Sequence, residues 1–149
     1  MTSQESQKSI LKLNLEGNPV LRHVMLAANG IGLAANQVNV GLKMFVLNYD
    51  AKTFINPKII EKSKEKQLLE EGCLSFPNLF FTVSRPKHIL VSWLDEKLNE
   101  QVDRFSGIWA QCIQHEIDHL NGVLFVDHVS KLKLRRAREK QRKVNDTSR

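Results

Sequence analysis

The sequence predicts an α+β fold, with antiparallel β-sheets packed around a central helix that carries an HExxH motif, and a basic helix at the C-terminus. Runs rich in β-branched and aromatic residues alternate with short polar segments, as strands and their connections do. One later segment has the three- and four-residue apolar spacing of a helix. The 149 residues are expected to form a single domain, residues 1–149, with its own core.

The first part of the chain predicts a turn and then a hairpin. Asn18-Pro19-Val20-Leu21-Arg22 is interpreted as a turn into a short segment, because proline fixes φ and interrupts a preceding helix. Residues 42–49 and 53–60 are strand-like and flank a short polar segment, which is typical of a β-hairpin. Residues 61–67 are expected to form a charged loop. Further strands are expected at 80–83, 88–94 and 101–105.

The central helix has clear start and stop signals. Ser106 is a suitable N-cap, and Asn121-Gly122 is a typical C-terminal stop. The apolar residues between them recur on one face: Trp109, Cys112, Ile113, Ile117 and Leu120. His115 and His119 border this apolar face, so we expect both imidazoles to point toward the protein core.

His115-Glu116-Ile117-Asp118-His119 is the motif that carries most information about function. Two histidines four residues apart lie one turn above each other on a helix and can share one metal ion. Glu116, beside the first ligand, can transfer protons. A bare HExxH also occurs by chance on solvated helices, but an inward-facing one is harder to explain without a ligand, because buried polar groups need partners.

A catalytic metal site needs a third protein ligand and an open position. Downstream of the helix, Asp127 is a weak candidate and His128 lies beyond the helix stop. Cys112 shares the helix face of the histidines, whereas Cys73 is distant in sequence. Three ligands on one helix would strain tetrahedral geometry, which favours Cys73 modestly, but the spacing leaves both cysteines possible.

Composition and charge indicate where the protein acts and which part of it is basic. The N-terminus lacks an apolar signal-peptide segment, and no apolar run is long enough to span a membrane. We therefore expect a protein that is not secreted and that acts in a bacterial-type cytosol, which includes the cytosol of a bacterium infected by a phage. The two cysteines are then expected to be free thiols. The formal charge is +6, yet nine basic and two acidic residues in 131–149 give that tail +7 and leave −1 for the rest.

Three separated blocks resemble the peptide deformylase family: residues 30–37 (GIGLAANQ), 71–75 (EGCLS) and 114–119 (QHEIDH). The first block alone is weak, but the three in this order are specific, and the likeness extends from about Asn18 to about Lys143. The resemblance implies that Cys73, His115 and His119 hold one metal ion. Fe²⁺ is the implied metal, and Zn²⁺, Ni²⁺ or Co²⁺ could substitute, since the ligand types do not force the choice.

The resemblance also implies the reaction: hydrolysis of the formyl amide of N-formylmethionyl nascent peptides, with release of formate. Glu116 is expected to move the proton, and the Gln37 side-chain amide and the Leu74 backbone N–H to form an oxyanion hole. Gly32 and Gly72 would let the peptide backbone approach as an added strand. The expected substrate-binding residues are Ile31, Gly32, Leu69, Gly72, Ile108 and Cys112.

Two departures from the family pattern accompany the likeness. The segment before the first block is short, which implies a shortened N-terminal helix. Phe80 stands where the family often has an arginine, although Arg85 matches a family position. Contacts to the outer part of a peptide substrate are therefore expected to differ.

Two other functions compete with the deformylase hypothesis. One is an HExxH peptidase that uses Cys112 or an acidic residue as third ligand. The other is a non-catalytic RNA- or ribosome-binding module that acts through its basic tail, from about residue 129 to 149. The tail also predicts contact with ribosomal RNA for a deformylase. We expect a monomer with no membrane partner.

Overall fold

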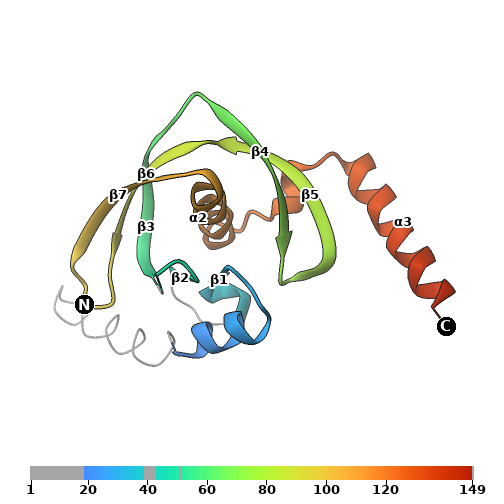
Figure 1. The fold of residues 1–149 in the computed structure, drawn as a ribbon, viewed down its shortest axis with the longest axis horizontal. Helices are drawn as coiled ribbons and strands as arrows, with labels where there is room; N and C mark the ends of the chain where they lie inside the picture. Colours follow the sequence, from blue (N-terminus) through green and yellow to red (C-terminus); the bar gives the residue numbers. More distant parts are fainter. Residues whose placement is uncertain (1–18, 39–42, 51, 149) are drawn as a thin grey trace.

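The computed structural model describes residues 19–38, 43–50 and 52–148, and helix α2 (Gly107–Leu120) lies at its centre. Figure 1 looks nearly along α2 and shows the sheets arranged around it. Strands β1 (Gly32–Ala34), β2 (Met44–Leu47), β3 (Thr53–Lys62), β6 (His88–Leu94) and β7 (Glu100–Ser106) form a five-stranded antiparallel sheet in the order β1-β2-β3-β6-β7. Strands β4 (Lys66–Cys73) and β5 (Phe76–Pro86) form a separate two-stranded sheet. The α+β prediction is confirmed.

The predicted hairpin is present, and the strands predicted at 88–94 and 101–105 also pair with each other. β2 and β3 pair with Phe45 opposite Phe54, and their rings stack with centroids 4.6 Å apart. β6 occupies the predicted residues 88–94 and pairs along its whole length with β7. Alternating burial along β6 places Ile89, Val91 and Trp93 on the core side.

Four local predictions need correction. Residues 61–67 are not one loop, because β3 continues to Lys62 and β4 begins at Lys66. The strand expected at 80–83 is part of the longer β5. β1 and β4 were not predicted. Residues 30–37, the first family-like block, include β1 and most of the short η1 (Ala35–Val38), and the second block begins at the end of β4. Residues 19–27 are helical where a turn was expected, since proline is compatible with the first turn of a helix.

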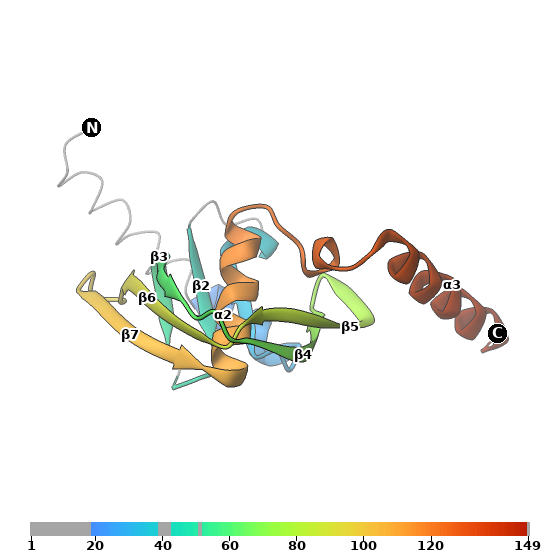
Figure 2. The ribbon, with the colours of Figure 1, turned by 90° about the horizontal axis from the view of Figure 1, so that it is seen from above.

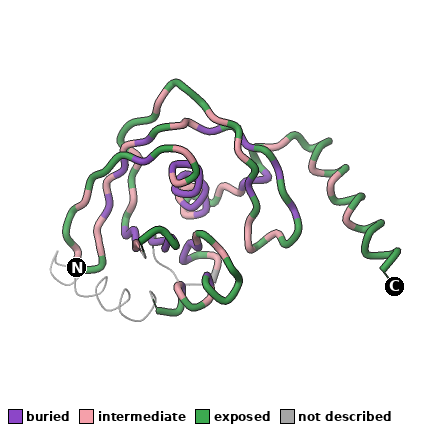
Figure 3. The backbone as a smooth tube through the Cα atoms, viewed as in Figure 1, coloured by how far each residue is buried: buried purple, intermediate pink, exposed green. Residues whose placement is uncertain are grey.

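The largest part of the core packs against α2. Its largest cluster joins α2 to the five-stranded sheet through Phe45, Phe54, Val91, Phe105 and Ile113. Figure 3 shows that buried positions concentrate in α2 and on the strand segments that face it. Gly122, with φ +75°, follows the C-terminal end of α2 as expected. Ser106 sits at the N-cap position, but its hydroxyl lies 2.6 Å from Nδ1 of His88 and makes no capping bond.

The C-terminal basic helix is present as α3 (Lys131–Thr147), which follows the short η2 (Phe125–His128). Figure 2 shows α3 projecting beyond the sheets. None of its residues is buried, and its contact with the body is made by half-buried Leu134 and Ala137 and by Gln141, whose Nε2 donates to the carbonyl oxygen of Asn78 (2.9 Å). Within the described ranges, no helix is both long enough and apolar enough to cross a membrane.

Candidate metal and catalytic site

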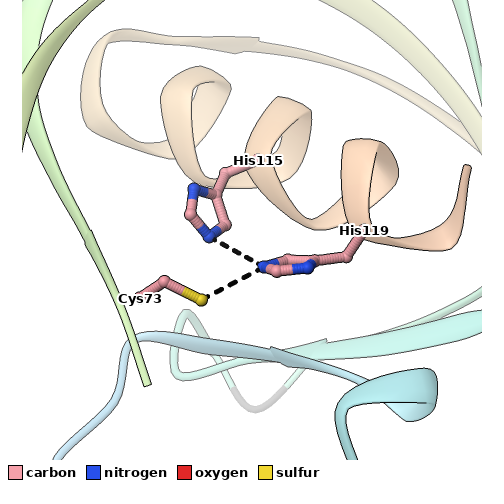
Figure 4. Close-up of side chains that lie close together, drawn as sticks. All are labelled: Cys73, His115 and His119. Carbon is pink, nitrogen blue, oxygen red and sulfur yellow. Dashed lines mark hydrogen bonds between the residues drawn. The ribbon is translucent and has the colours of Figure 1, made fainter. Parts of the chain in front are cut away.

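Cys73, His115 and His119 converge at the centre of the molecule. Cys73 ends β4, and the two histidines lie one turn apart on the face of α2 that points toward it (Figure 4). Nε2 of His119 is 3.3 Å from Sγ of Cys73 and 3.1 Å from Nε2 of His115. All three ligand atoms lie within 4.8 Å of one another. Both histidines are buried and Cys73 is half-buried.

The chemistry of these three atoms fits a divalent cation. One sulfur and two imidazole nitrogens suit a borderline-soft transition metal, and three ligands leave a fourth position open for water or substrate. Burial raises the pKa of Cys73, but hydrogen bonds with His115 and His119 outweigh it and bring the pKa to about 5. These contacts therefore favour the thiolate form that a metal ion needs.

The competing third ligands lie elsewhere. Cys112 is buried on α2 and does not belong to the ligand group, and burial raises the pKa of its thiol to about 12. Asp127 caps η2, accepting a hydrogen bond from the backbone N–H of Leu124 (2.8 Å). His128 pairs with Asp118 at 2.8 Å.

Glu71 orients His115 from behind. Its Oε1 lies 2.8 Å from Nδ1 of His115, which directs Nε2 of that ring to the ligand group. Arg85 binds both oxygens of Glu71, at 2.7 and 2.9 Å, and its Nη1 donates to Asp118 (2.7 Å). Gln111 also donates to Glu71. Burial raises the pKa of Glu71, but the bonds with His115 and Arg85 overcome this and hold it at about 2.

This supporting network is the part of the site that sequence reasoning missed. A signal was present: Glu71 and Cys73 are two residues apart in a strand and therefore point to the same face. The partner Arg85 could not be identified in this role, because the pairing of β4 with β5, Gln67 opposite Arg85, comes from the hairpin. The same contacts keep the pKa of His115 high: burial lowers it, but bonds with Cys73 and Glu71 raise it to about 10.

Glu116 is a buried carboxyl without a full set of partners. Its Oε2 makes no hydrogen bond to any described residue. Burial raises its pKa to about 7, because nothing in that part of the site compensates the charged form fully. Gly32 packs against it so closely that a Cβ there would lie 2.8 Å from Oε1. The Glu116 carboxyl can therefore exchange a proton near neutral pH. The room for this carboxyl depends on the absence of a side chain at Gly32.

Gln37 and Leu74 lie beside the ligand group. Nε2 of Gln37 is 3.4 Å from Sγ of Cys73 and 3.1 Å from Oγ of Ser75, while its Oε1 accepts from the backbone N–H of Ala34 (2.9 Å). The side-chain amide is thus fixed with its N–H groups toward the ligands. Asn36, next to it on η1, donates to the carbonyl oxygen of His119 and ties η1 to α2.

A cavity of about 880 Å³ opens onto these groups. All six expected substrate-binding residues line it, and so do all the expected catalytic and metal-binding residues except His119: Gln37, Cys73, Leu74, His115 and Glu116. Among them, Ile31 and Ile108 are about half exposed at 48% and 56%, whereas Cys112 is buried.

Comparison with known proteins identifies the family of this chain. Residues 16–135 match the family described as polypeptide deformylase. The chain is 47% identical over 125 residues to a peptide deformylase of Psychrobacter cryohalolentis, covering 80% of this chain and 68% of the relative. It is 49% identical over 124 residues to that of Saccharophagus degradans, covering 80% and 72%.

Solved structures show the same likeness. A peptide deformylase from Synechococcus elongatus in complex with actinonin superposes with a TM-score of 0.76 at 42% identity, covering 80% of this chain and 68% of that one. The peptide deformylase from Ehrlichia chaffeensis superposes with a TM-score of 0.78 at 38% identity, covering 94% and 85%.

Proposed function

The chain belongs to the polypeptide deformylase family, and we propose that Cys73, His115 and His119 hold the divalent metal ion of this enzyme. It is a metal-dependent hydrolase that removes the N-terminal formyl group from formylmethionyl peptides and releases formate. The observation that carries the residue assignment is the convergence of one thiolate and two imidazole nitrogens. Next to them lies a buried carboxyl with an oxygen that has no hydrogen-bond partner among the described residues. One ion per chain fits this set.

The chain's own residues divide the chemistry between them. When bound, the metal supplies a Lewis acid that lowers the pKa of water and polarises the formyl oxygen. Glu116, with a pKa near 7, accepts the proton of the attacking water and returns it to the leaving amine nitrogen. The Gln37 amide and the Leu74 N–H donate to the formyl oxygen as negative charge develops on it. Glu71 holds His115 in place throughout.

Substrate binding is assigned to the free edge of β4. Among the described strands β4 pairs only with β5, so its other edge offers backbone groups to an added strand. Gly32 of β1 and Gly72 of β4 both line this cavity and permit close approach of a peptide backbone. The methionine side chain enters between Ile31, Leu69, Ile108 and Cys112, an apolar wall that excludes water from the site.

The identity of the metal is part of the proposal. Fe²⁺ is proposed as the native ion, with Zn²⁺, Ni²⁺ or Co²⁺ as substitutes that the same ligands accept. An Fe²⁺ site with a thiolate ligand is sensitive to oxidation of either partner. Activity should therefore decay faster in air or peroxide with Fe²⁺ than with Ni²⁺ or Zn²⁺, where only the thiolate can be oxidised.

The test of the function is formate release from a formylated dipeptide such as formyl-Met-Ala. Protein loaded anaerobically with Fe²⁺ should release stoichiometric formate, and acetyl-Met-Ala, which lacks the small formyl group, should be a poor substrate. A metal-loaded protein that cleaves internal peptide bonds instead, or that releases no formate, would exclude the proposed activity.

The basic tail is a candidate binding site for a partner other than the peptide substrate. Residues 131–149 carry a formal +7, and the described part of α3 buries none of its side chains. A projecting cationic helix suits contact with nucleic-acid phosphates, so ribosomal RNA close to emerging nascent chains is its proposed partner. The protein is proposed to act there as a monomer in the bacterial-type cytosol.

A further inference from the structure

Phe80 is an exposed aromatic side chain at the outer side of the substrate cavity. It lies on β5, is 59% exposed and lines the cavity together with Glu70 and Gly72 of β4. Large aromatic side chains seldom remain this exposed without a contact to make, although single cases are normal. The position of this ring relative to β4 shows what it could contact.

The ring of Phe80 lies across β4 toward the unpaired edge of that strand. Phe80 pairs directly with Gly72, so both point to the same face of the hairpin. A Cβ built on Gly72 would lie 2.5 and 2.7 Å from two ring carbons of Phe80. The ring therefore occupies the place of the missing Gly72 side chain and extends from β5 over the neighbouring strand.

The alternation of side chains then determines which substrate residue meets this ring. Leu69, Glu71 and Cys73 point to the inner face of β4, and Glu70 and Gly72 to the solvent face, which also carries Phe80. A peptide added to the free edge of β4 with its methionine inward must turn its second side chain outward. That side chain would lie beside the Phe80 ring and close to Glu70.

We propose that Phe80, together with Glu70, determines which second residue of a formylmethionyl peptide the enzyme prefers. This inference rests on the proposed function and adds the substrate class. The ring favours a bulky apolar or a basic second side chain, through apolar contact or a cation–π contact. No lysine or arginine lines the described cavity, and Glu70 is exposed at its edge, so an acidic second side chain is disfavoured.

The experiment compares formyl-Met-Xaa-Ala amides with Xaa = Ala, Leu, Phe, Arg or Glu. In the wild-type protein, kcat/KM for Leu, Phe and Arg should exceed that for Ala by about 3- to 10-fold, and Glu should be poorest. Phe80→Ala should lower kcat/KM for the Leu, Phe and Arg peptides to near the value for the Ala peptide, mainly through a higher KM. Phe80→Tyr, which keeps an aromatic ring, should retain the wild-type preference. Glu70→Gln should raise kcat/KM for the Glu peptide about 2- to 5-fold relative to the Ala peptide.

The matched control is Leu68→Ala, which removes another exposed apolar side chain from the same face of β4 but outside the cavity. It should leave every ratio unchanged. Equal losses for all five peptides in Phe80→Ala, or a wild-type protein that does not distinguish them, would overturn the inference while formate release still supports the proposed function. No formate from any peptide would overturn both.

Discussion

Glu116 and Glu71 are both buried carboxyls within one site, and their surroundings give them opposite properties. Glu71 is held by Arg85, His115 and Gln111 and stays ionised, with a pKa of about 2. Glu116 has an oxygen without a partner among the described residues and a pKa of about 7. One carboxylate is therefore suited to hold a ligand in position and the other to move a proton.

Glu116→Gln separates proton transfer from metal binding. The amide preserves the volume and cannot accept a proton, so turnover of formyl-Met-Ala should fall by about 10²- to 10⁴-fold. Metal content, measured by atomic absorption, should remain equal to that of the wild-type protein. Loss of metal in this variant would assign Glu116 a ligand role and contradict the division of labour.

Glu71 should stabilise the metal-free protein only while it is ionised. Because its folded-state pKa lies below its ordinary value of 4.5, its contribution is complete above pH 4.5 and disappears as the pH falls toward 2. Glu71→Gln should lower the free energy of unfolding at pH 7 by about 3–5 kcal/mol, since it leaves Arg85 buried without its main partner. Urea unfolding at several pH values measures this.

The difference between Glu71→Gln and wild type should shrink between pH 4.5 and 2. Glu70→Gln, at the exposed neighbouring position, is the control and should change stability little at any pH. A deficit of Glu71→Gln that stays constant down to pH 2.5 would show that its carboxylate charge is not responsible.

At the scale of elements, the sequence was most informative where side-chain periodicity and burial agree. The apolar face of α2 predicted that helix and the inward direction of His115, and the strand predicted at 88–94 is β6. β4 was missed because Glu70, Glu71 and Gly72 do not look like a strand. Besides Leu69, its inner face carries a carboxylate and a thiolate, and the contacts with Arg85 and the histidines make their burial possible.

The HExxH spacing alone indicated His115, His119 and Glu116, but the choice of Cys73, the roles of Gln37 and Leu74 and the cavity residues depended on the family resemblance. Spacing on α2 left Cys112 and Cys73 as alternatives, because a ligand that comes from another element depends on how β4 packs against α2. The stacking of Phe80 on Gly72 could not be predicted for the same reason: it depends on the register of β4 and β5.

The close packing of β1 against α2 gives a prediction at this scale. In Gly32→Ala, the new methyl group would meet Oε1 of Glu116 at 2.8 Å and Leu47 at 3.0 Å, so the carboxylate must shift. Turnover should fall by about 10-fold or more, in line with the sensitivity of catalysis to small displacements, and metal content should be retained. The double variant Gly32→Ala/Glu116→Gln should be little slower than Glu116→Gln alone. Fully additive losses would show that Gly32 acts by another route.

At the scale of the whole molecule, the positive charge and the catalytic site lie in different parts of the chain. The catalytic body carries a formal −1 over residues 1–130, and the excess positive charge lies in the tail that contains α3. Figure 2 shows this helix extending away from the sheets that contain the site. Binding to a polyanion through α3 and turnover of a small peptide should therefore be separable.

Reversing three charges tests that separation. Arg135, Arg136 and Arg138 replaced by glutamate should leave turnover of formyl-Met-Ala unchanged, because none of them lines the described cavity. Co-sedimentation with ribosomes at low salt should fall, and the binding of the wild-type protein should weaken steeply as salt rises. Ribosome binding that survives the triple reversal, or that is indifferent to salt, would leave α3 as a solvated helix without this role.

The assignment of the metal ligands is the central claim, and metal stoichiometry in two single-cysteine variants tests it most directly. Each variant removes one thiol: Cys112→Ala removes one on α2 and Cys73→Ala one at the end of β4. Only Cys73 lies in the ligand group. After reconstitution with Co²⁺ or Zn²⁺ and gel filtration, Cys112→Ala should retain about one ion per chain and Cys73→Ala should retain almost none. Full occupancy in Cys73→Ala, or loss of the ion in Cys112→Ala alone, would contradict the site described above.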